Sequence, residues 1–143
     1  MLAASGASAA DEKELQARLQ RTTSVTCRFT AMAAGDWPAG VPAPAIRPAS
    51  LSVAFDHVNV EEGSARVAAQ VGSIDVITRF ANGVLHFMES FREGALYVTS
   101  VFPVQAGQTA LAAVHSRHEF TRVQVPGYTS RPEQYYGSCD IDR

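Results

Sequence analysis

The densest group of ionisable side chains lies in one short stretch, His115-Ser116-Arg117-His118, which is followed by Glu119. Histidine and glutamate at this spacing could transfer protons or bind a metal ion. The stretch ends a predicted strand, so His115 and Arg117 should point to one face and Ser116 and His118 to the other. Two ligands three residues apart on a strand do not converge on one ion, whereas zinc needs three or four. We therefore expect no metal and no cofactor, and the alternative to chemistry is a set of polar residues at a strand end.

Glu89 is the second candidate, because it shares a strand face with Leu85 and Phe87 while His86 lies on the opposite face. If that face is interior, Glu89 is a buried carboxylate, which needs a partner or a raised pKa. Arginines on other predicted strands are its candidate partners, in a purely structural pair or beside the carboxylate of a bound ligand. The candidate ligand-binding residues are therefore Arg66, Arg79, His86, Glu89, Tyr97, His115, Arg117 and His118.

Two cysteines, Cys27 and Cys139, are separated by 112 positions (139 minus 27). This separation excludes a CxxC redox motif or a zinc knuckle. A disulfide between them would be typical of an oxidising compartment, and two separate buried thiols are the alternative. Residues 1–10, MLAASGASAA, resemble the end of a signal peptide with Ser8 and Ala10 before the cleavage site; the alternative is a flexible head. Together these features predict a periplasmic or secreted protein.

The composition of the chain limits the classes of protein to which it can belong. The chain has 143 residues, 46% of them hydrophobic and 18% charged, with a net charge of −2. This predicts a single domain over residues 11–143. No basic face is visible for nucleic acid, and no apolar run approaches the roughly 20 residues of a transmembrane helix.

The elements that must position these residues are one helix followed by strands. Residues 11–21 predict a helix that Asp11 caps and whose Leu15 and Leu19 form a narrow apolar stripe. From residue 24 onward, apolar residues alternate and turn signals recur about every 10–11 residues, as in an antiparallel meander. Asn82-Gly83 is the strongest hairpin signal, and a change of phase near Asp56 predicts a bulge.

Three segments depart from this alternation of apolar residues. Residues 35–48 contain four prolines, which predict a loop of polyproline character with Trp37 folded back onto the body. Residues 121–125 are a possible eighth strand. Residues 126–143 predict a tail that crosses the outside of the barrel and is fastened to the first strand by Cys27–Cys139.

Seven strands with a possible eighth are enough to close on themselves, and closure removes exposed strand edges. The sequence therefore predicts an all-β fold, a small antiparallel up-and-down barrel with one short N-terminal helix; a β-sandwich is the alternative. Gly35-Asp36-Trp37 has the Gly-x-Trp form found at the first strand of lipocalins. With the meander and the late cysteine, the chain resembles a small calycin-type barrel in architecture, although its tryptophan follows a predicted strand.

Three functions from different classes fit these observations. The first is a non-catalytic binding module that holds a small apolar or amphipathic ligand inside the barrel. The second is an envelope accessory or protein-interaction domain with a filled core, which would bind a partner through the N-terminal helix, the proline-rich loop at 35–48 or the C-terminal tail around Tyr135 and Tyr136. The third is an enzyme in which His115 or His118 acts as acid or base opposite Glu89.

Overall fold

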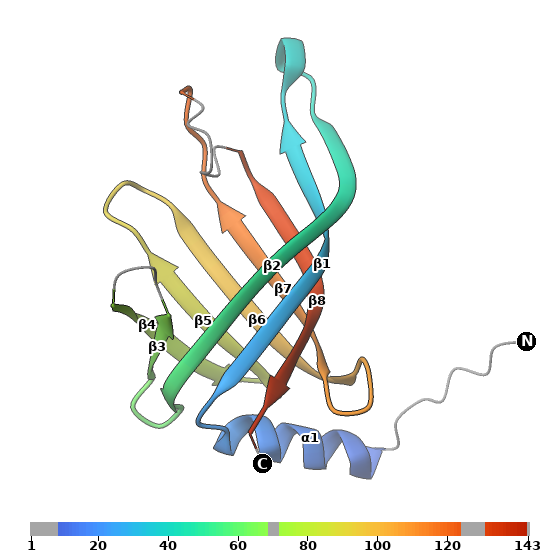
Figure 1. Ribbon diagram of the computed structural model, residues 1–143, viewed down its shortest axis with the longest axis vertical. Helices are drawn as coiled ribbons and strands as arrows, with labels where there is room; N and C mark the ends of the chain where they lie inside the picture. The colour runs from blue at the N-terminus through green and yellow to red at the C-terminus, as the bar shows by residue number, and fades with distance from the viewer. Residues whose placement is uncertain (1–8, 69–71, 124–130, 143) are drawn as a thin grey trace, which may run out of the picture.

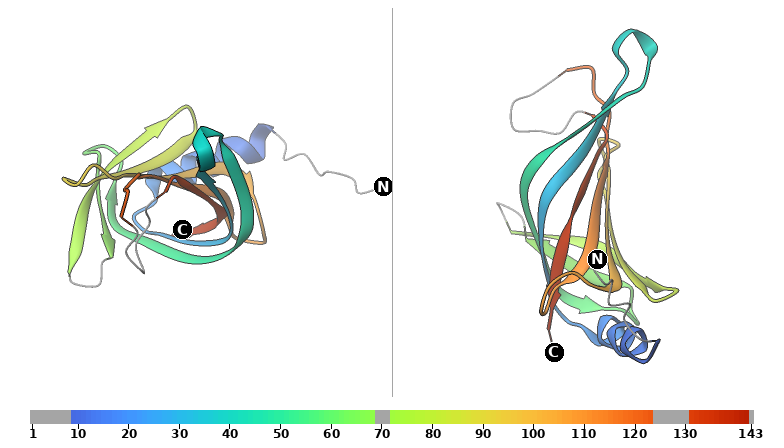
Figure 2. Two further views of the ribbon diagram at one scale, coloured as in Figure 1. Left: turned by 90° about the horizontal axis from the view of Figure 1, so that it is seen from above. Right: turned by 90° about the vertical axis from the view of Figure 1, so that its right-hand side faces the viewer.

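The computed structural model describes residues 9–68, 72–123 and 131–142, and it shows an antiparallel barrel with a helix at one end (Figure 1). Each strand pairs with the next along the chain, and the last strand pairs with the first, which closes the sheet (Figure 2). The predicted up-and-down barrel is confirmed. The elements are α1 (Ala9–Arg21), β1 (Val25–Asp36), a 3-10 turn (Pro38–Gly40), β2 (Ala43–Asn59), β3 (Ser64–Ala68), β4 (Ser73–Ala81), β5 (Val84–Ser90), β6 (Leu96–Gln105), β7 (Leu111–His118) and β8 (Glu133–Ile141).

Helix α1 closes the lower end of the barrel in Figure 1. Its apolar stripe, Leu15 and Leu19, is buried and joins the core, as predicted. The helix also covers the β4–β5 turn, where Gln16 lies against Gly83. Asn82 and Gly83 both have positive φ, which confirms the predicted tight hairpin. The predicted head, 1–10, lies mostly outside the described residues, and its last two residues already belong to α1.

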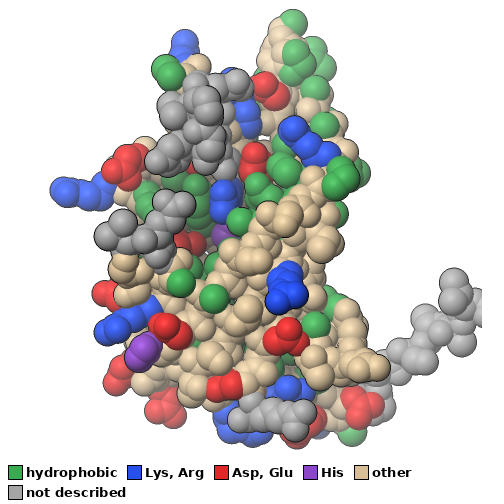
Figure 3. Space-filling model, viewed as in Figure 1, with side chains coloured by type: hydrophobic (Ala, Val, Ile, Leu, Met, Phe, Trp, Pro, Cys, Tyr) green, Lys and Arg blue, Asp and Glu red, His purple; other side chains and the backbone are tan. Residues whose placement is uncertain are grey.

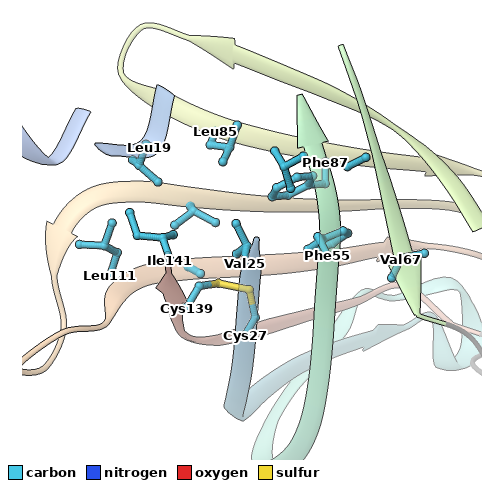
Figure 4. Packing of buried hydrophobic residues seen from close by; sticks show 14 of the residues in the cluster. Leu19, Val25, Cys27, Phe55, Val67, Leu85, Phe87, Leu111, Cys139 and Ile141 are labelled. Carbon is cyan, nitrogen blue, oxygen red and sulfur yellow. A yellow bond between two sulfur atoms is a disulfide. The ribbon is translucent and has the colours of Figure 1, made fainter. Parts of the chain in front are cut away.

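The apolar core fills the part of the barrel next to α1 (Figure 4). It is built from alternating, inward-facing residues of all eight strands. The rings of Phe55 and Phe87 stack there at a centroid distance of 4.0 Å. Val25, Leu85 and Leu111 are almost completely buried beside them. The barrel is therefore solid at this end, and any interior site must lie nearer the opposite, open end.

The seam between β1 and β8 closes the barrel. Cys27 and Cys139 face each other across it and form the predicted disulfide. The predicted outer tail is wrong, because residues 133–141 are the eighth strand itself. Residues 121–123 form no strand, and the rest of the predicted strand 121–125 lies outside the described residues. Gly137 allows β8 to approach β1 closely, because a Cβ at this position would lie 2.0 Å from the carbonyl oxygen of Arg28.

The predicted loop at 35–48 is also wrong, because β1 continues to Asp36 and β2 begins at Ala43. Pro44 pairs with Gly35 and Pro48 with Ala31. Proline is tolerated where a strand has only one partner, and within the described residues 43–54 pair with β1 alone. The predicted bulge is confirmed by the register shift between Asp56 and Asn59. Among the described residues, β2 pairs with β3 only from Phe55 to Asn59, near α1.

Candidate functional site

Polar side chains gather on the inner face of β5 to β8, near the strand ends that border the open end. Across these strands, Glu89 pairs with Tyr97, Tyr97 with Arg117, and Arg117 with Glu133. The next inward-facing row contains Thr99, His115 and Tyr135. We call the following six residues the polar cluster: Glu89, Tyr97, Thr99, His115, Arg117 and Tyr135. Figure 3 shows the same face hollowed beside β2, with basic and histidine side chains visible inside.

Arg117 is the centre of the polar cluster. Its guanidinium carbon lies 4.7 Å from the ring centroid of Tyr97 and 5.4 Å from that of Tyr135. Its Nε donates a hydrogen bond of 3.1 Å to Nε2 of His115. The cation is therefore held between two aromatic rings and oriented by a third, an arrangement that a planar guanidinium suits better than an ammonium group.

His115 is 1% exposed and has partners at both ring nitrogens. Arg117 can only donate, so Nε2 of His115 must accept and the ring proton must be on Nδ1. Nδ1 lies 2.7 Å from Oγ1 of Thr99, which therefore accepts a hydrogen bond from the Nδ1–H group. Burial, together with the charge of Arg117, lowers the pKa of His115 from 6.5 to about 4. The imidazole is therefore neutral at neutral pH and acts as an acceptor that positions Arg117.

The acidic and phenolic groups complete the polar cluster. Burial raises the pKa of Glu89, and the charge of Arg117 partly offsets this effect. Burial and the neighbouring Glu133 raise the pKa of Tyr135 to about 12. The hydroxyl of Tyr135 donates to Glu133, and that of Tyr97 donates to Glu119 at 3.2 Å. Both phenols are therefore protonated donors under physiological conditions.

A pocket of about 290 Å³, which we call the rim pocket, opens beside the polar cluster where β1, β2, β7 and β8 reach the open end. Its apolar lining comes from β1 and β2, with Ala33, Ala34 and Pro44. Its polar lining includes Arg117, His118 and Glu133. Its volume is close to the lower limit for small-molecule sites, and its lining combines apolar and polar residues.

The structure brings four of the eight candidate residues together in the polar cluster, and a fifth, His118, lines the rim pocket beside Arg117. Glu89, Tyr97, His115 and Arg117 belong to the polar cluster, as the alternation of the strands indicated. The other four lie on the outer surface or at the rim: Arg66 pairs with Asp75, Arg79 is exposed, His86 contacts Ser100 at 2.7 Å, and His118 is exposed. Of the arginines considered as partners for Glu89, Arg117 faces it from inside the barrel, whereas Arg66 and Arg79 are exposed on the outer surface.

Tyr135 was not predicted as a site residue, because its segment was assigned to an outer tail. The sequence nevertheless contained a pattern that indicates its position. Tyr135, Gly137 and Cys139 are spaced two residues apart, so on a strand they share one face. Because Cys139 is bridged to Cys27 of the first strand, that shared face is the inner one. Thr99 was not predicted as a site residue either.

Within residues 9–68, 72–123 and 131–142, no three histidine, cysteine or acidic side chains lie close enough to hold a metal ion. No helix in the described part of the chain is both long and apolar enough to cross a bilayer. Comparison of the chain with protein-family models, with curated proteins and with solved structures gives no match. Function must therefore be argued from the polar cluster and the rim pocket themselves.

Proposed function

We propose that this protein is an exported binding module that takes a small amphipathic molecule at the open end of the barrel, with its anionic group at Arg117. The observation that carries the proposal is the rim pocket, whose lining combines apolar residues of β1 and β2 with Arg117. A ligand with a carboxylate and a short apolar part would match both kinds of lining. The buried disulfide supports export, because such bonds persist in oxidising compartments.

The geometry argues against the acid–base alternative built on His115 and His118. In that alternative one of the two histidines acts opposite Glu89, but His118 is exposed and lies on the face of β7 opposite the inward-facing His115, away from the buried Glu89. Both ring nitrogens of His115 are engaged, and its pKa of about 4 makes it a weak base at neutral pH. A positioning role for His115 agrees with the binding proposal.

Arg117→Met tests the proposal with an amphipathic sulfonate, 1-anilinonaphthalene-8-sulfonate, as the probe. The variant should bind the probe about 10-fold or more weakly, because a hydrogen bond to a charged group contributes roughly 1.5–3 kcal/mol. The matched control is Arg79→Met, an exposed arginine on the outer surface, which should leave the affinity unchanged. The measurement is probe fluorescence, with displacement by a medium-chain fatty acid as confirmation.

A second variant keeps the experiment informative if Arg117→Met is unstable. Arg117→Lys retains the charge but not the planar group between Tyr97 and Tyr135, so its affinity should be intermediate. Thermal unfolding of each variant separates loss of binding from loss of fold. Equal affinities of the folded Arg117 variants and the wild type would contradict the proposal.

A further inference from the structure

The β1–β2 hairpin projects from the open end, farther from α1 than the rest of the described chain (Figures 1 and 2). Trp37 is 47% exposed there, and the ring of Phe120, from the connection between β7 and β8, meets it edge-on at 6.1 Å. The sequence-based expectation that Trp37 folds back onto the barrel is therefore wrong. We call the exposed apolar residues at this end the apolar tip: Trp37, Val41, Ile46, Phe120 and Val123.

The concentration of these residues is unusual for a surface. They are five of the ten large hydrophobic side chains that are exposed in the described part of the chain. Single exposed hydrophobic residues are ordinary, whereas a cluster of them at one end marks a binding surface. The apolar tip borders the rim pocket, because Gly35 and Pro44 of the same hairpin line that pocket.

Arginines outnumber acids around the apolar tip, where the two acids are Asp36 and Glu119, and Glu119 accepts a hydrogen bond from the hydroxyl of Tyr97. Residues 37–55 contain a single charged side chain, Arg47, which is exposed. Asp36 precedes them and is paired with Arg131 at 3.0 Å. Arg131 also lies over the ring of Phe120 at 4.7 Å, and Arg122 is exposed on the same connection. The apolar tip is thus bordered by more arginines than acids, and of the two acids Asp36 is paired with Arg131.

We propose that the apolar tip docks this protein on the interface of an anionic lipid bilayer. The inference rests on the proposed function and deepens it, because docking would turn the rim pocket toward a membrane that supplies its amphipathic ligand. Tryptophan prefers the bilayer interface, and arginines beside it would meet lipid phosphates. A stable protein partner needs a surface of about 800 Å² on each side, whereas a narrow projecting hairpin fits a fluid interface better.

The backbone of the hairpin limits how deep it enters. Within the described residues, 43–54 of β2 pair with β1 only, so the other edge of β2 has main-chain groups without a strand partner. Such groups are not tolerated in the hydrocarbon core. The apolar tip therefore reaches the headgroup region and goes no farther.

Trp37 is the single tryptophan of the chain and reports directly on docking. Vesicles of phosphatidylglycerol and phosphatidylcholine should shift its emission to shorter wavelength and should co-sediment the protein. Vesicles of phosphatidylcholine alone should bind more weakly, and added salt should weaken binding to the anionic vesicles.

A double variant, Val41→Ser with Ile46→Ser, keeps the reporter and removes two exposed aliphatic side chains of 63% and 86% exposure. It should bind the anionic vesicles about 10-fold or more weakly. The matched control is Ile77→Ser with Val104→Ser, which changes two side chains of 56% exposure on the barrel wall. The control should bind as the wild type does.

Three results would overturn the docking proposal. The first is the absence of both an emission shift and co-sedimentation. The second is equal binding by the two double variants. The third is self-association of the wild type that Val41→Ser with Ile46→Ser abolishes, which would assign the apolar tip to a second copy of the chain.

The two proposals fail separately. If the Val41/Ile46 variant binds the sulfonate probe as the wild type does, and the wild type does not bind vesicles, only the docking proposal is contradicted. If the wild type docks on vesicles but neither it nor Arg117→Met binds the probe, the docking stands and the ligand-binding proposal falls.

Discussion

Replacing His115 by glutamine should remove much of the acid sensitivity of folding. His115 is buried and neutral in the folded protein, where its pKa is lowered to about 4 by burial and by Arg117, whereas in the unfolded chain it titrates near 6.5. Above the unfolded value the histidine is neutral in both states, so it adds no pH dependence. As the pH falls below that value, the unfolded chain binds a proton that the folded protein does not accept until about pH 4. The contribution is therefore complete at neutral pH and is lost as the pH falls.

The size of the effect follows from the two values. Each unit of difference in pKa corresponds to about 1.4 kcal/mol, so acidification to about pH 4.5 should lower the free energy of unfolding by about 2.5 kcal/mol through His115 alone. Asp36 and Asp142, whose pKa values are lowered in the folded protein, add acid sensitivity of their own. Their contribution is common to the wild type and the variant and cancels in the comparison.

The assay is urea unfolding at a series of pH values for the wild type, His115→Gln and a control, His118→Gln. Glutamine keeps an acceptor for Arg117 but does not titrate. The wild type and the His118 variant should lose stability in parallel on acidification, because His118 is exposed at the rim. His115→Gln should lose about 2.5 kcal/mol less over the same range. Equal pH dependence of the wild type and His115→Gln would refute a buried, neutral His115.

Two further predictions concern the seam between β1 and β8. Replacing both cysteines by alanine, Cys27→Ala with Cys139→Ala, should lower the free energy of unfolding by about 5 kcal/mol, because the bridge spans 112 residues. Urea unfolding measures this, and a loss below about 1 kcal/mol would contradict the cross-link. Gly137→Ala should destabilise by about 3 kcal/mol, because the new Cβ would lie 2.0 Å from the carbonyl oxygen of Arg28. Gly35→Ala on β1 is its control, since a Cβ there meets nothing within 4 Å, and similar losses for both variants would show that the seam can relax.

The alternation of side chains along a strand predicted which residues of the candidate site face the inside of the barrel. Glu89, His115 and Arg117 lie inward because side chains alternate along a strand, and this holds for any sheet that buries one face. The same rule separates His86 and His118 from them. It also separates Arg66 and Arg79 from Arg117, because Arg66 alternates with the buried Ala65 and Val67 and Arg79 follows the buried Thr78, so the predicted arginine set was wider than the pattern supports.

The errors in the fold have a common physical cause. Proline between 38 and 48 predicts a loop, because it removes a hydrogen-bond donor from a sheet with neighbours on both sides. β2 has a single neighbour over residues 43–54 in the described chain, so the missing donors are tolerated. The C-terminal segment likewise becomes a strand only because β1 and β7 are present on its two sides. Whether an edge is available is a property of the whole barrel and cannot be read from local residues.

The sequence by itself determined the class of fold, the helix that carries Leu15 and Leu19, and the inward phase of β5 and β7. These follow from spacing, which acts through local backbone geometry. Only the tertiary structure decided that Tyr135 joins Tyr97 around Arg117, and that the apolar tip stands beside the rim pocket. Both arise from the closure of β8 onto β1, a contact between chain segments more than a hundred residues apart whose geometry depends on every strand between them.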